Sequence, residues 1–227
     1  NLHCIIVKDQ PSTIIGAMLI YDRILSYCKI DCNVTGLSYF AIHPKHQNDS
    51  ASQLIKKKLF EYLDNNSDIS VGIARKVMDN YWFPYGYRGF TNFCHITYPL
   101  HVLPRSKSKL TSASPTENDL PFISNSYSDS YASSLGSLKR DNILWTYYLK
   151  KYVKSPVNFE VLFHGQQSVG YLIIQGNLVL EAGIESEFLR EATKFIAGYM
   201  GGKNYHDVIF DIGQQHPLIV YLSQYEH

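Results

Sequence analysis

Residues 36–63 contain the groups of this chain that are best suited to bind an anion. An apolar stretch ends at Ile42, a histidine–proline turn follows, and small polar residues then open a segment with helical periodicity. A strand that leads into a helix presents the unpaired N–H groups and the partial positive charge of the helix N-terminus, which suit a phosphate. Asp49 or Ser50 could cap this helix, because their side-chain oxygens accept from those N–H groups.

The helix expected from residue 50 is amphipathic and carries lysines in its second turn. Its apolar residues recur at helical spacing on one face: Ala51, Leu54, Ile55, Leu59, Tyr62 and Leu63. Lys56, Lys57 and Lys58 are close enough to the helix start for a long cation to reach a bound phosphate. The alternative is an ordinary strand–turn–helix corner with solvated lysines, because a phosphate loop without glycine is a weak signal.

Composition narrows the class of protein. The 227 residues suffice for one or two domains with a real core, and the 21 basic and 20 acidic residues give no reason to expect a nucleic-acid partner. No apolar run is long enough to span a bilayer and no signal peptide is visible. The four cysteines form no C-x-x-C pair, which is typical of thiols in a reducing compartment, and Cys28 with Cys32 lacks the second pair of a metal site. These features predict a cytoplasmic protein without a metal or a membrane partner.

Apolar patterns predict a mixture of strands and helices. Strands are expected at residues 2–7, 13–21, 36–42, 69–74, 92–103, 159–163, 170–175 and 208–212, the first two as a hairpin. Helices are expected at residues 50–63, 75–81 and 188–199, with further helical patterns between 119 and 152. This order predicts an α+β fold with mixed sheets rather than a doubly wound parallel sheet.

Residues 104–118 are polar and rich in serine and lack aromatic side chains, which is typical of a linker. We therefore expect a first domain at 1–103 and a second domain at 119–227.

Two landmarks resemble the GCN5-related N-acetyltransferases. The loop at residues 47–52 (QNDSAS) resembles the family's acetyl-CoA loop, which has Arg or Gln, two residues, Gly, one residue, then Gly or Ala. Downstream, residues 81–87 (YWFPYGY) resemble a second landmark, an aromatic pair followed by glycine and an aromatic residue. Residues 138–141 (LKRD) with Trp145 resemble the start of the second domain in tandem members, which include the mycobacterial enhanced-intracellular-survival acetyltransferases.

The resemblance implies two tandem domains, each with a central, mostly antiparallel mixed sheet flanked by helices. The first would lack the family's N-terminal arm, and the second would be degenerate. The implied activity is acetyl-CoA-dependent N-acetyl transfer to a primary amine of a small molecule or peptide. A free N–H near Ala41 or Ile42 would polarise the thioester carbonyl, and the cofactor's pantetheine arm would pair with the same strand. The implied cofactor-binding residues are Phe40, Ala41, Ile42, Gln47, Asn48, Asp49, Ser50, Ala51 and Ser52.

The chain departs from the family pattern in the loop and in the second landmark. Ser50 and Ser52 stand where the family has glycines, and Trp82 stands where it has a tyrosine acid. Tyr81 or Tyr85 is therefore expected to protonate the leaving thiolate.

The general base and the activity itself have alternatives. His43 and His95 are candidate bases, although each could equally be a surface or packing histidine. A catalytically degenerate acyl-CoA-binding or interaction protein has the same landmarks, and an unrelated mixed α/β binding module would share only the element order.

Overall fold

The computed structural model describes residues 1–27, 30–47, 50–72, 82–88, 95–104, 106–132, 137–153 and 156–225. The chain divides into two compact units, Asn1–Phe90 (unit 1) and Thr91–His227 (unit 2). The boundary expected after residue 103 differs, because β5 (Ile96–Pro99) pairs with β11 (Asp207–Phe210) of unit 2. The expected linker also contains a strand, β6 (Leu110–Ala113), at the edge of the same sheet. A short polar edge strand needs mainly backbone hydrogen bonds, so composition does not reveal it.

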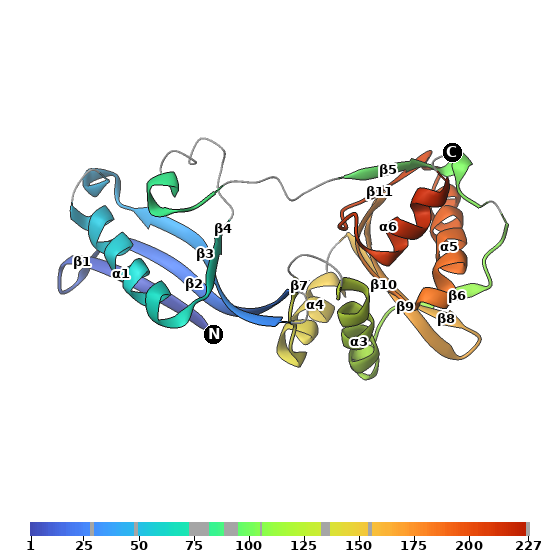
Figure 1. Ribbon diagram of the computed structural model, residues 1–227, viewed down its shortest axis with the longest axis horizontal. Helices are drawn as coiled ribbons and strands as arrows, with labels where there is room; N and C mark the ends of the chain where they lie inside the picture. The colour runs from blue at the N-terminus through green and yellow to red at the C-terminus, as the bar shows by residue number, and fades with distance from the viewer. Residues whose placement is uncertain are drawn as a thin grey trace. The chain divides into compact units, whose positions relative to one another are not determined.

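Unit 1 is built on a sheet with the strand order β1-β2-β3-β4 (Figure 1). The strands β1 (Leu2–Gln10), β2 (Thr13–Tyr27) and β3 (Ile30–Ile42) pair antiparallel, and the first two form the expected hairpin. The short β4 (Ile69–Gly72) pairs parallel with β3, so α1 (Ser50–Asn66) serves as the crossover between them.

The core of unit 1 lies between α1 and the hairpin. Burial follows the helical period that the sequence shows, with Ala51, Ile55, Leu59 and Leu63 packed among Val7, Ile15, Met18 and Ile20. Leu54 differs from the expectation, because 45% of its surface is exposed.

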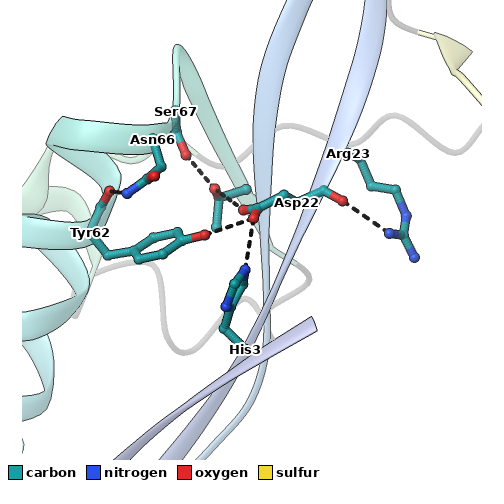
Figure 2. Close-up of polar contacts among 7 residues, drawn as sticks. His3, Asp22, Arg23, Tyr62, Asn66 and Ser67 are labelled. Carbon is teal, nitrogen blue, oxygen red and sulfur yellow. Dashed lines mark hydrogen bonds and ion pairs between the residues drawn. The ribbon is translucent and has the colours of Figure 1, made fainter. Parts of the chain in front are cut away.

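Asp22 of β2 ties the C-terminal end of α1 to the sheet (Figure 2). Its carboxylate accepts hydrogen bonds from Tyr62 Oη at 2.7 Å, Thr35 Oγ1 at 3.0 Å and His3 Nε2 at 3.0 Å. Thr35 also hydrogen-bonds to Ser67, which follows α1. Burial alone would raise the pKa of Asp22, but the three donors hold it below its usual value. The ionised carboxylate therefore joins β1, β2, β3 and α1 at one point.

Unit 2 contains a sheet with the strand order β5-β11-β10-β9-β8-β6. Antiparallel pairs link β8 (Val157–His164) to β9 (Gln167–Gln175) and β9 to β10 (Leu178–Ile184), whereas β10 and β11 run parallel. The helices are α3 (Leu120–Tyr131), α4 (Asn142–Val153), α5 (Leu189–Gly202) and α6 (Pro217–Leu222), and the short β7 (Ser137–Leu138) precedes α4.

Helices cover both faces of this sheet (Figure 1). Successive side chains of a strand point to opposite faces, so one strand serves two cores. On β9, Leu172 and Ile174 pack with residues of α5 and α6, whereas Tyr171 and Ile173 pack with residues of α3 and α4.

The second core contains a buried ion pair at the point where the sequence resembles the start of a second domain. Arg140 donates to the two carboxylate oxygens of Glu181 at 2.7 and 2.6 Å. Its guanidinium lies 4.1 Å from the ring centre of Tyr127 and 4.8 Å from that of Trp145. Burial would lower the pKa of Arg140, but Glu181 outweighs this effect and raises it. The pair anchors the start of α4 to β10.

These layers confirm the expected α+β class, with mixed, mostly antiparallel sheets flanked by helices. The helix expected at residues 75–81 lies outside the described residues. Within the described ranges, no helix combines the length and the apolarity that crossing a bilayer requires.

Candidate functional site

The last third of β3 contains a bulge. Ala17 faces Ala41 and Leu19 faces Ser38, so β3 holds one residue more than β2 over this span. Tyr39 within the bulge has a φ of 49°, a left-handed conformation that is uncommon for a non-glycine residue, and 79% of its surface is exposed. Bulges and strained residues of this kind are enriched at functional sites.

Beyond Leu37, β3 loses its neighbour on one side in the described part of the chain. Pairing with β4 runs from Val34 and Ile69 to Leu37 and Gly72, whereas pairing with β2 continues to Ile42. The strand therefore has an open edge along its last residues, where an extended ligand could form backbone hydrogen bonds.

The register decides which backbone groups face this open edge. His43 N–H donates to Ile15 O at 2.8 Å, so the residue before it, Ile42, directs its N–H and C=O away from β2. By the same alternation Ala41 faces β2, whereas the bulge interrupts the alternation at Tyr39 and Phe40. Of the two residues expected to supply a free N–H, Ile42 is the one that faces the opening.

The expected loop leads from this edge into α1. His43 is extended and its Nδ1 accepts from Lys45 N–H at 3.4 Å, Pro44–His46 forms a 3₁₀ turn (η1), and the exposed Gln47 follows. The helix begins at Ser50, which is exposed, while Ala51 and Ser52 are buried. Asn48 and Asp49 lie outside the described residues.

A hollow of about 390 Å³ lies beside the first turn of α1. It is lined by the hairpin residues Val7, Lys8, Asp9 and Ile15 and by the helix residues Ser50, Ala51, Gln53, Leu54 and Lys57. The exposed Leu54 is therefore one wall of a cavity that also presents two lysines.

The three lysines of α1 have different environments. Lys56 is 5% exposed, and its Nζ donates to Tyr85 Oη at 2.8 Å. Lys57 lines the hollow, and Lys58 pairs with Glu61 at 2.6 Å. Lys57 is thus the lysine that is exposed beside the helix start, and the buried Lys56 contradicts the interpretation of all three as a solvated face.

The second landmark brings Trp82 to the bulge. Its ring lies 6.2 Å from that of Phe40 and 5.3 Å from that of Tyr87. The residue at the family's tyrosine position therefore does contact the open strand, but as an indole. Tyr87 Oη hydrogen-bonds to Ser70 of β4 at 2.5 Å, and burial raises its pKa.

The candidate acids lie elsewhere or are not described. Tyr85, in the turn Phe83–Tyr85 (η3), stacks on Phe60 with ring centres 5.2 Å apart, and its hydroxyl accepts from Lys56. These partners belong to the middle of α1, and Tyr81 lies outside the described residues. Both assignments stay predictions.

The two candidate bases belong to different units of the chain. His43 is exposed and belongs to the loop of unit 1, whereas His95 is in unit 2, with Nε2 3.7 Å from Asp211 Oδ1. Within the described residues, no group of three or more His, Cys, Asp or Glu side chains could hold a metal ion.

Unit 2 repeats the strand–turn–helix–strand motif of unit 1. Its bulged β10 leads through Glu185 and the 3₁₀ turn Ser186–Phe188 (η6) into α5 and then to the parallel β11. Glu185 has φ −59° and ψ 134°, close to the −54° and 132° of His43. Its N–H donates to Val169 O, as that of His43 donates to Ile15 O, so Ile184 corresponds to Ile42.

The corresponding edge in unit 2 is occupied by side chains of the same unit. Ile184 N–H donates to Ser130 Oγ at 3.1 Å, and Ala182 O accepts from His216 Nε2 at 2.9 Å. His216 is fully buried and also accepts from Leu218 N–H at 3.2 Å. The backbone groups that an extended ligand would need are therefore already hydrogen-bonded.

Solved N-acetyltransferases have this fold. A GCN5-related N-acetyltransferase from Anabaena variabilis has a TM-score of 0.70 at 15% identity, covering 95% of this chain and 57% of that one. One from Kribbella flavida has a TM-score of 0.68 at 14% identity, covering 96% and 55%. Eis1 from Mycobacterium abscessus has a TM-score of 0.66 at 12% identity, covering 95% and 57%. No family model and no curated protein matches the sequence.

The chain thus has the fold of the GCN5-related N-acetyltransferases, which confirms the resemblance seen at residues 47–52 and 81–87 at the level of the fold. It spans a little over half of the length of each of these proteins.

Sequence reasoning did not identify three features of the site. These are the bulge at Tyr39, the contact of Trp82 with Phe40, and the burial of Lys56 against Tyr85. The substitution of Trp82 at the tyrosine position was a usable signal for the second. The other two depend on strand register and on a contact between distant segments, which local periodicity does not report.

Proposed function

We propose that unit 1 is an acyl-CoA-dependent N-acyltransferase module that uses acetyl-CoA and transfers its acetyl group to a primary amine of a small molecule or peptide. The observation that carries this proposal is the bulged β3, whose end at Ile42 faces no partner strand among the described residues and leads through the loop into the first turn of α1. An extended amide-containing arm and an anionic pyrophosphate need these two features in this order.

The residues present fit such a cofactor. The N–H and C=O of Ile42 face the opening, so they can pair with an amide of the arm, or the N–H can hydrogen-bond to a thioester oxygen, where negative charge develops during acyl transfer. The N–H groups of Ser50, Ala51 and Ser52 are in the first turn of α1 and can hold a phosphate, and Lys57 adds a cation beside it. When bound, acetyl-CoA would supply the activated acetyl group.

Proton transfer to the leaving thiolate is the step at which this chain departs from the family pattern. Trp82 beside Phe40 can donate a hydrogen bond from its indole N–H, but it cannot give up a proton at neutral pH. A thiol has a pKa of about 8.5, so a thiolate can leave slowly without an acid. The absence of an acid at the position of Trp82 favours the alternative function, a protein that binds acyl-CoA without turnover, unless Tyr81 supplies the proton.

The test is calorimetric titration with acetyl-CoA, followed by thiol release with a panel of amines. We expect Ser50→Trp to weaken acetyl-CoA binding more than about tenfold, because an indole would fill the phosphate position at the helix start. The matched control is Asp64→Trp, an exposed position at the far end of α1, which should bind as the parent does.

The outcomes separate the candidate functions. Binding with thiol release supports the transferase, and binding without release on any amine supports the alternative. Absence of binding in the parent chain, or equal affinity of Ser50→Trp and parent, would refute the placement of the cofactor.

A further inference from the structure

A groove of about 570 Å³ lies in unit 2, between α5 and the segments at residues 100–104 and 106–112. Its lining residues all belong to unit 2, so it is separate from the open edge of β3. Its volume is within the range of cavities that hold small molecules, about 300–1,000 Å³.

Two glycines of α5 keep the groove open. A Cβ built on Gly198 or on Gly201 meets no atom within 4 Å, so neither glycine is needed for close packing. Glycine inside a helix costs about 1 kcal/mol relative to alanine. The two glycines therefore make α5 less stable than alanines would, and in the structure they leave the space of the groove unfilled.

The body of the groove is apolar. Leu100, Leu110 and Phe195 form its walls, and the ring of Phe195 is stacked on that of Tyr199 at 6.1 Å. An apolar chain placed here would remove these surfaces from water, which is favourable by about 25 cal/mol for each Å² buried.

The rim of the groove is cationic. Lys194 lines it and pairs with Glu191 at 2.6 Å, and the second carboxylate oxygen of Glu191 accepts from Lys109 N–H at 2.9 Å. Lys107 also lines the groove, is exposed, and forms no ion pair with the residues that the structure describes. Because the one carboxylate here is already engaged, Lys107 is left to attract an anion.

We propose that this groove binds a linear amphiphile with a carboxylate head, such as a medium-chain fatty acid. The chain lies along Leu100, Leu110 and Phe195, and the carboxylate is paired with Lys107. This assignment is independent of the cofactor placement in unit 1.

The test is calorimetric titration of the full chain with decanoate below its micelle concentration, with decanol as the uncharged comparison. Gly198→Leu, which fills the groove, should abolish saturable binding of both ligands. Gly202→Leu is the matched control, because it lies on the same helix, also has open space at its Cβ, and does not line the groove. Lys107→Glu should weaken decanoate about fivefold and leave decanol unchanged.

Circular dichroism and thermal unfolding of each variant establish that it is folded. Gly198→Ala, which adds only one methyl group to the groove, provides a second groove variant. The proposal is overturned if the parent shows no saturable decanoate binding. It is equally overturned if folded Gly198→Leu binds as Gly202→Leu does. Equal loss of decanoate and decanol binding in Lys107→Glu would refute the carboxylate contact.

Discussion

His216 shows how one buried side chain can close a strand edge. Its Nε2–H donates to Ala182 O, while its Nδ1 accepts from Leu218 N–H at the start of α6. The bond from Leu218 requires an unprotonated Nδ1 and therefore the neutral ring. Burial lowers the pKa of His216 to about 4, because a charged ring would lose its hydration and have to donate where it now accepts.

We expect this histidine to make the folded state sensitive to acid. The unfolded pKa is about 6.5 and the folded pKa is about 4, so the unfolded state binds the proton first. The stabilisation is complete above pH 6.5 and is lost as the pH falls to 4, by about 3 kcal/mol in total.

Chemical denaturation at pH 7, 5 and 4 measures this loss. The control is His216→Asn, whose side chain can still cap α6 but does not titrate. The free energy of unfolding of the variant should fall less over the same range, and parallel curves for variant and parent would contradict the assignment. Asp22 and Glu191 have lowered pKa values and titrate in both proteins, so the comparison removes their contribution.

At the scale of elements, β3 combines a bulge with an exposed edge. The extra residue breaks the regular pairing with β2 at Tyr39, and the described part of β4 pairs with β3 only as far as Leu37. A strand held on one side by β2 and free on the other can add an extended ligand without losing its place in the sheet.

We expect the backbone of the bulge to be sensitive to substitution at Tyr39. Tyr39→Val should lower the free energy of unfolding by about 1–2 kcal/mol, because β-branched residues tolerate the left-handed conformation poorly. Tyr39→Gly should leave it nearly unchanged, since relief of strain offsets the greater entropy of the unfolded chain.

Urea denaturation distinguishes this effect from loss of a side chain. The control is Ile14→Gly on β2, another exposed strand position without a positive φ, which should lose about 1 kcal/mol. Similar losses for Gly at positions 14 and 39 would contradict the strained conformation.

At the scale of the whole molecule, the chain contains one strand–turn–helix–strand motif twice, with different outcomes. The loop residues His43 and Glu185 have nearly the same backbone conformation. In unit 1 the edge at Ile42 has no partner strand among the described residues, whereas in unit 2 the edge is bonded to Ser130 and His216.

This difference predicts one acyl-CoA per chain. Calorimetry with acetyl-CoA should give a stoichiometry of one, and Ser50→Trp should remove all measurable binding. Two sites of similar affinity, or a residual site in Ser50→Trp, would show that the edge of β10 opens to ligand. Unit 2 would then be a ligand-binding domain and not the degenerate domain that the resemblance implies.

The secondary structure of single segments was predictable where it depends on residues that are neighbours in the sequence. The hairpin near Pro11, the start of the helix at Ser50 and the buried stripe of Ile55, Leu59 and Leu63 follow from turn chemistry and helical spacing. These signals depend on residues close together in the chain. Phe40, Ile42 and Ser50 are binding positions that the resemblance implies, and these assignments stay predictions.

Tertiary structure decided the features that join distant segments. Whether residues 96–99 belong with the first or the second half depends on their pairing with Asp207–Phe210, and no local pattern encodes that choice. Lys56 is buried against Tyr85, and Trp82 lies beside Phe40 of the bulge, although both contacts join residues that are far apart in the sequence.

The sequence by itself thus determined a mixed fold and a helix start that is preceded by a strand. Only the folded chain decided which N–H groups face outward, since a shift of one residue in register reverses every backbone and side-chain direction. It also decided that the edge of β10 is bonded to side chains of α3 and of the start of α6, whereas the corresponding edge at Ile42 has no partner strand among the described residues.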